Sequence, residues 1–169
     1  ADAGYEKRLR LLSPTDRKAL LDGVWELNDG QYFAEFSREM HVVKPYDIPK
    51  EWRRYLTIDY GLDMLAALWI AQSPDGQSVV YRELYQPGLI ISEAAARVLD
   101  CEAAGEHIDC RLAPPDLWNR RQETGRSAVE LFADCGLDFE KSSNERVSGW
   151  LALHELLLPK KDADGVLRP

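Results

Sequence analysis

Three apolar, strand-like segments follow one another in the middle of the chain, and this run constrains the fold more than any other feature. The segments are rich in β-branched, aromatic and aliphatic side chains and cover residues 55–60, 65–71 and 79–85. Gly61 closes the first segment, and the stretch from Ser73 to Gly76 has the composition of a tight turn. The sequence therefore predicts three consecutive antiparallel strands.

Helical and strand-like patterns alternate after this run. Ser92 is the expected N-cap of a helix that ends before Gly105. The remaining expected elements are a strand over 108–112, a helix over 128–135, a strand over 137–141 and a helix that begins at Ser143 or Asn144 and ends at Pro159. The predicted order, three strands and then helix, strand, helix, strand, helix, is the plan of the ribonuclease H-like fold, an α/β fold with a mixed sheet and helices on both faces.

A core can be expected from the same patterns, since 45% of the residues are apolar. The expected core residues are Leu56, Ile58, Leu68, Ile70, Val80, Val98, Leu131, Phe132, Trp150 and Leu151. Residues 1–48 are expected to form a partly helical arm outside this core. Pro45 and Pro49 mark an extended connector, because proline continues neither a helix nor a central strand. We therefore expect the folded domain to span 49–169.

The charge balance limits how the chain can bind nucleic acid. With 21 basic and 29 acidic residues the net charge is −8, which excludes a surface that grips DNA through bulk positive charge. The three cysteines show no CxxC pairing, so neither a disulfide framework nor a zinc site is indicated. No apolar run reaches the roughly 18 residues of a membrane span. The expected protein is soluble and cytoplasmic.

One loop is locally basic within this acidic chain. It carries Arg111, Arg120, Arg121 and Arg126, with Asp116 and Glu123 as its only acids. Arginine side chains position a DNA backbone by binding its phosphates, so Arg120, Arg121 and Arg126 are candidate DNA-binding residues, and Lys141 is a further one. The alternative is a solvated loop whose arginines pair with nearby acids.

Two aspartates follow strands that are neighbours in this fold. Asp59 lies at the end of the first strand, where burying its charge would require a compensating partner such as a metal ion. Asp116 lies just past the fourth strand. Two-metal phosphodiester hydrolysis needs several carboxylates around Mg²⁺ or Mn²⁺, so both are candidate catalytic and metal-binding residues. The alternatives are that Asp59 caps a turn and Asp116 caps a short helix.

Other polar residues are left outside this site. Asp63 is expected to be a solvent-exposed turn residue, and Glu83 is expected to pair with an arginine. His154, on an apolar helix face, is expected to be packed or hydrogen-bonded. The five tryptophans are expected to serve packing.

Several segments resemble the large subunits of phage terminases, the ATP-driven motors that package DNA into capsids and cut it. The segments that resemble the linker between ATPase and nuclease are Leu20-Leu21-Asp22-Gly23-Val24-Trp25 and Gly30-Gln31-Tyr32-Phe33. The segment Ile48-Pro49-Lys50-Glu51-Trp52 resembles the stretch that leads into the catalytic strand. Those that resemble the nuclease are Thr57-Ile58-Asp59-Tyr60-Gly61, Ala113-Pro114-Pro115-Asp116-Leu117-Trp118, Phe139-Glu140-Lys141 and Asn144-Glu145-Arg146-Val147-Ser148-Gly149-Trp150.

The resemblance implies a metal-dependent endonuclease that cuts double-stranded DNA with two Mg²⁺ or Mn²⁺ ions. It also implies the terminase small subunit and the portal protein as partners, and the host bacterial cytoplasm as location. The chain lacks the glycine-rich phosphate loop of the family's ATPase half, so no ATP site is expected. The family has another catalytic aspartate downstream, so we expect a fragment whose nuclease domain is incomplete at its C-terminal end and which, taken alone, cuts DNA weakly or not at all.

Two alternatives remain open at the level of sequence. The first alternative to a terminase nuclease is a non-catalytic module that docks the packaging motor. The second is a resolvase or transposase-type nuclease of the same fold.

Overall fold

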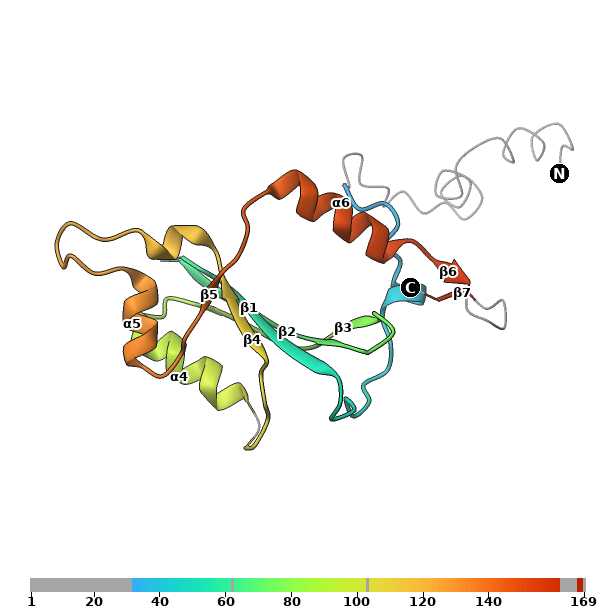
Figure 1. The fold of residues 1–169 in the computed structure, drawn as a ribbon, viewed down its shortest axis with the longest axis horizontal. Helices are drawn as coiled ribbons and strands as arrows, with labels where there is room; N and C mark the ends of the chain where they lie inside the picture. The colour runs from blue at the N-terminus through green and yellow to red at the C-terminus, as the bar shows by residue number, and fades with distance from the viewer. Residues whose placement is uncertain (1–31, 62, 103, 162–166, 169) are drawn as a thin grey trace, which may run out of the picture. The chain divides into compact units, whose positions relative to one another are not determined.

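The structure, a computed structural model, describes residues 32–61, 63–102, 104–161 and 167–168 (Figure 1). The predicted helices of the arm and Trp25 lie outside the described residues. The described residues fall into two compact units, one within Ala1–Val42 and Leu151–Pro169, the other within Val43–Trp150. The predicted division into 1–48 and 49–169 stays a prediction.

A mixed five-stranded sheet forms the centre of the Val43–Trp150 unit. Its strands are β1 (Arg53–Tyr60), β2 (Met64–Gln72), β3 (Ser78–Pro87), β4 (Cys110–Ala113) and β5 (Glu140–Lys141). They lie in the order β3-β2-β1-β4-β5. The pairs β1–β2 and β2–β3 are antiparallel, and the pairs β1–β4 and β4–β5 are parallel. The predicted α/β class and element order are confirmed, with one short 3₁₀ helix, η1 (Pro115–Trp118), added after β4.

Two helices cover one face of this sheet. They are α4 (Ile91–Cys101) and α5 (Ala128–Asp134), which lie side by side in Figure 1 and contact each other. Val98 of α4 and Phe132 of α5 are fully buried in one cluster with Leu56 and Ile58 of β1. Four of the expected core residues are therefore confirmed.

Alternate residues of β2 face the core, but they are not the ones expected, Leu68 and Ile70. Trp69 is fully buried opposite Leu56, whereas Leu68 is 37% exposed. An apolar run does not show which of its two faces meets the core, and pairing with β1 decides this, because side chains on paired strands share a face. The expectation was also wrong for Val80, Trp150 and Leu151, which are exposed, while Ile70 and Leu131 are half-buried.

Helix α5 begins with a capping box. The Ser127 hydroxyl accepts a hydrogen bond from the Glu130 backbone N–H at 3.4 Å, and the Glu130 carboxylate accepts one from the Ser127 N–H at 2.7 Å. The expected cap of α4 was wrong: Ser92 is exposed inside the helix and the N-cap is Ile90, whose N–H donates to Glu93. The N-terminal caps of α4 and α5 thus give hydrogen-bond partners to backbone N–H groups that the first turn of a helix otherwise leaves unpaired.

These two serines give a matched test. Ser127→Ala should lower the free energy of unfolding by about 1 kcal/mol, because it removes an N-cap acceptor. Ser92→Ala should change it by less than about 0.5 kcal/mol, as for other surface positions. Urea unfolding followed by circular dichroism measures both. Equal effects of the two substitutions would contradict the assignment of the cap.

The other unit contains α3 (Arg38–His41), β6 (Lys160–Lys161), β7 (Leu167–Arg168) and the last residues of α6 (Arg146–Leu157). His154 Nδ1 lies 2.9 Å from Glu35 Oε2, and its ring packs against those of Tyr32 and Phe33. These ring contacts confirm the prediction that His154 is packed or hydrogen-bonded. No helix among the described residues is long and apolar enough to cross a membrane.

Candidate functional site

Asp59 lies on the face of the sheet opposite the core. Its neighbours Ile58 and Tyr60 are buried, and Asp59 itself, paired with Ala66 of β2, is exposed. The expectation that its charge is buried was wrong, because alternate residues of a strand point to opposite faces. The Asp59 carboxylate is instead open to solvent and to any ligand that approaches this face.

Asp116 follows the strand that runs parallel to β1. Thr57 pairs with Leu112, so Asp59 lies two residues beyond this level on β1, and Asp116 lies four residues beyond it in η1. The carboxyl ends of parallel neighbours meet at one edge of a sheet, so both aspartates belong to this edge. Asp116 is exposed and does not cap η1, whose N-cap is Pro114. The interpretation of Asp116 as a helix cap was wrong.

The two aspartates supply the kind of ligand that hard divalent cations prefer, since carboxylate oxygens bind Mg²⁺ and Mn²⁺. Among the residues that the structure describes, however, no group of three or more His, Cys, Asp or Glu side chains could hold a metal ion. The donor type therefore fits a divalent cation, but these two residues alone do not complete its shell.

Most arginines of the basic loop have acidic partners. Arg126 Nη1 lies 2.6 Å from Asp134 Oδ2, and this hydrogen bond lowers the pKa of the Asp134 carboxyl, so both groups stay charged. Arg120 Nη2 is 3.7 Å from Glu130 Oε1, with 74% of the arginine side chain exposed. Such an exposed pair is weak and leaves Arg120 free to exchange its partner for a phosphate.

Two other basic residues differ from these. Arg121 is exposed and forms no ion pair within the described part of the chain. Lys141 of β5 has its Nζ 5.0 Å from the centre of the Trp118 ring, in a cation–π contact that places this lysine beside the basic loop.

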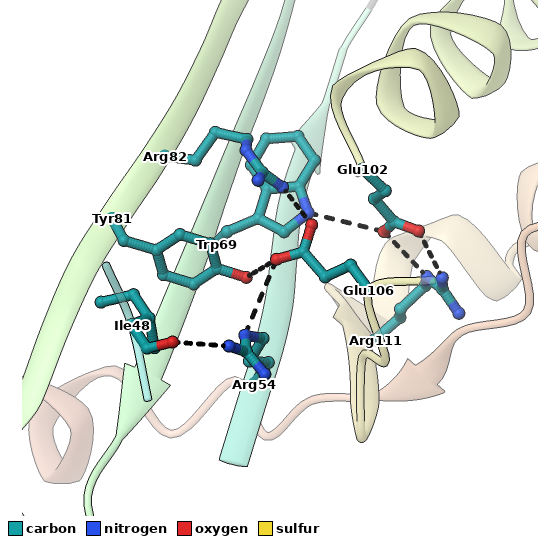
Figure 2. Close-up of polar contacts among 8 residues, drawn as sticks. All are labelled: Ile48, Arg54, Trp69, Tyr81, Arg82, Glu102, Glu106 and Arg111. Carbon is teal, nitrogen blue, oxygen red and sulfur yellow. Dashed lines mark hydrogen bonds and ion pairs between the residues drawn. The ribbon is translucent and has the colours of Figure 1, made fainter. Parts of the chain in front are cut away.

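A partly buried charged network at the other end of β1 was not foreseen (Figure 2). The Glu106 carboxylate accepts hydrogen bonds from Tyr81 Oη at 2.9 Å and from Arg82 Nη1 at 2.8 Å. Arg54 Nε lies 3.7 Å from it, and Arg54 Nη2 donates to the Ile48 carbonyl at 3.1 Å. Burial and the Glu106 carboxylate raise the pKa of Tyr81, which therefore stays a neutral donor.

A β-bulge makes this network possible. Pairing between β2 and β3 shifts so that Trp69 opposes Arg82 and Ile70 opposes Val80, which leaves Tyr81 as an extra residue. Tyr81 and Arg82 consequently reach the same carboxylate, as bulges redirect side chains. Glu83 was expected to pair with an arginine, but it forms no ion pair within the described residues, so this expectation was wrong. Its neighbour Arg82 pairs with Glu106 instead.

A second ion pair extends the network. Arg111 donates to Glu102 from Nε at 3.3 Å and from Nη2 at 2.7 Å, and Glu102 also lies 3.5 Å from Trp69 Nε1. Arg82 stacks over the Trp69 ring at 5.4 Å. Arg111, the first arginine of the basic loop, therefore serves this network rather than the loop surface.

No protein-family model and no curated protein matches the sequence. Three structures of the large terminase from the thermophilic bacteriophage D6E match the fold. The first structure has a TM-score of 0.57 and 15% sequence identity, and the match covers 75% of this chain. The complex with ADP has a TM-score of 0.60, 17% identity and 90% coverage of this chain. The complex with ATP-γ-S has a TM-score of 0.62, 16% identity and 93% coverage. This chain has a fold found in a large terminase. It spans between 33% and 39% of the D6E large terminase chains.

Proposed function

We propose that the chain belongs to the nuclease domain of a viral DNA-packaging terminase large subunit, and that the intact protein cuts double-stranded DNA by metal-dependent hydrolysis. The placement of Asp59 at the carboxyl end of β1 and of Asp116 just after its parallel neighbour β4, at one edge of the sheet, is the observation that carries this proposal. Similarity in fold to the D6E large terminase supports it.

Each candidate residue has a distinct role in this proposal. Asp59 and Asp116 hold Mg²⁺ or Mn²⁺ together with a further carboxylate from outside the described residues. The bound ions supply an activated water and stabilise the departing 3′ oxygen. The DNA backbone is positioned by basic residues of the same loop and of β5, namely Arg120, Arg121, Arg126 and Lys141.

The rest of the proposal concerns the whole motor. Residues 1–48 join the nuclease to an ATPase region, and 49–169 belong to the nuclease. The terminase small subunit and the portal protein are the partners, and the protein acts in the cytoplasm of the host bacterium.

Calorimetric titration of the 169-residue chain with Mn²⁺ tests the metal site. We expect a binding event that Asp59→Ala and Asp116→Ala each abolish and that Asp63→Ala preserves, because Asp63 is an exposed acid of the β1–β2 turn. All three positions are exposed, so the variants should fold, which circular dichroism checks. Binding that survives both Asp59→Ala and Asp116→Ala would contradict the assignment.

A non-catalytic docking module is the second candidate. It is favoured by the finding that, in the described part of the chain, no group of three or more His, Cys, Asp or Glu side chains could hold a metal ion. Absence of measurable Mn²⁺ binding by the wild-type chain in the same titration would support this candidate. A resolvase or transposase of the same fold would prefer branched DNA or transposon ends to linear duplex.

A further inference from the structure

A pocket of about 480 Å³ opens at the carboxyl end of β1, on the face that α4 and α5 cover. Tyr60, Leu89, Ile91 and Leu131 give it mostly apolar walls, and Arg121 and Asp134 contribute charged groups. Its volume lies in the range of about 300–1,000 Å³ that small-molecule sites occupy. The nuclease roles proposed above use only Arg121 among its lining residues.

The Tyr60 side chain is held in place on the wall of this pocket. Its hydroxyl donates a hydrogen bond to the Leu89 carbonyl at 2.9 Å, and its ring packs edge-on against Phe132 at 5.3 Å between centres. Burial raises the pKa of Tyr60, so the phenol stays neutral, while the nearby Arg121 charge acts against this rise. The pocket thus has a fixed aromatic wall with a guanidinium close by.

Charge favours an anionic ligand. The Asp134 carboxylate is paired with Arg126 at 2.6 Å, so its charge is neutralised within the protein. Arg121 forms no ion pair in the described part of the chain, and an arginine fork binds phosphate through parallel hydrogen bonds. A ligand for this site therefore combines an apolar ring with a phosphate.

We propose that this pocket binds one unpaired nucleotide of a DNA strand, with the base between Leu89, Ile91 and Leu131 and the phosphate on Arg121. The inference rests on the proposed function, which makes DNA the ligand. Arg121 follows Asp116 by five residues in the same loop. Tyr60, which lines the same pocket as Arg121, is next to Asp59 at the end of β1, so a phosphate on Arg121 lies at the same end of the sheet as the metal-binding aspartates. Apolar contacts with the faces of a base do not depend on which base it is.

Amide NMR titrations of the ¹⁵N-labelled 169-residue chain in EDTA test this proposal, with deoxyadenosine 5′-monophosphate as the first probe. Shifts should concentrate at 88–92, Leu131 and Cys135, which line the pocket. Deoxyadenosine, without phosphate, and deoxyribose 5-phosphate, without base, should each bind at least about tenfold more weakly. A 5′-phosphorylated single-stranded trinucleotide should bind more tightly than the monophosphate.

Variants separate the pocket from general phosphate attraction. Arg121→Ala and the pocket-filling Leu131→Trp should each weaken binding by at least about tenfold, whereas Arg97→Ala, at an exposed arginine of α4 outside the pocket and the proposed DNA-binding residues, should change it by less than about twofold. If Leu131→Trp fails to fold, the exposed Arg121→Ala still decides.

Three outcomes overturn the proposal: equal binding of deoxyribose 5-phosphate and the nucleotide, unchanged binding by Arg121→Ala, or tighter binding of the free nucleotide than of the strand. Because EDTA removes divalent ions, these results are independent of whether Asp59 and Asp116 bind metal.

Discussion

Replacing Glu106 by alanine should destabilise the Val43–Trp150 unit by about 3–5 kcal/mol, the usual effect of removing one partner from a buried ion pair. The Glu106 side chain is only 10% exposed, with Arg82 at 26% and Arg54 at 15%. Its loss leaves both guanidinium groups without this counter-charge and removes the acceptor of the Tyr81 hydroxyl. Desolvation of the remaining charges, more than the lost contacts, sets the size of the effect.

Glu83 supplies the matched control for this substitution. It lies on β3 directly after Arg82, but it is exposed. Glu83→Ala should therefore change the free energy of unfolding by less than about 0.5 kcal/mol. Urea unfolding, monitored by circular dichroism, measures both variants. Similar losses for Glu83→Ala and Glu106→Ala would show that the Glu106 network does not hold β1, β3 and the α4–β4 connection together.

Asp59→Asn in the intact protein should lower the rate of Mn²⁺-dependent DNA cleavage by more than about a hundredfold. Residues that merely orient metal ligands cost about 10–100-fold when replaced, so a direct ligand should cost more. The substitution keeps the shape of an exposed side chain and removes its charge, so stability should hardly change. Asp116→Asn should have the same effect.

Nicking of supercoiled plasmid at several Mn²⁺ concentrations measures this loss. Asp63→Asn removes the same charge from the neighbouring turn and should retain the wild-type rate, which controls for net charge near the DNA. Full activity of the double variant with both Asp59 and Asp116 replaced would refute the proposed catalytic site.

The order of the elements could be predicted because it depends on local signals. Turn residues around Gly76 separate β2 from β3, and Gly136, at a φ of +86°, ends the helical pattern of α5 as expected. The positions of Asp59 at the end of β1 and of Asp116 after β4 followed from the same boundaries. These features need only the alternation of apolar residues and the residues that interrupt it.

The features that could not be predicted depend on pairing between strands. Trp69 rather than Leu68 meets the core because of its register with β1, and apolar composition is alike on both faces of β2. The bulge at Tyr81 likewise arises from the pairing of β2 with β3, and it brings Arg82 to a carboxylate 24 residues away. The sequence predicted Tyr60 only as a strand residue. The pocket that it lines is formed by segments far apart in the sequence, so no local sequence pattern could predict it.

The central claim, that Asp59 and Asp116 share a divalent cation, is tested most directly by anomalous diffraction from crystals of the chain soaked in Mn²⁺. The account predicts one anomalous peak with carboxylate oxygens of both aspartates at about 2.1–2.2 Å, the distance typical of small hard cations. A fully soaked crystal without a peak at either carboxylate, or with manganese bound elsewhere on the sheet, would contradict it.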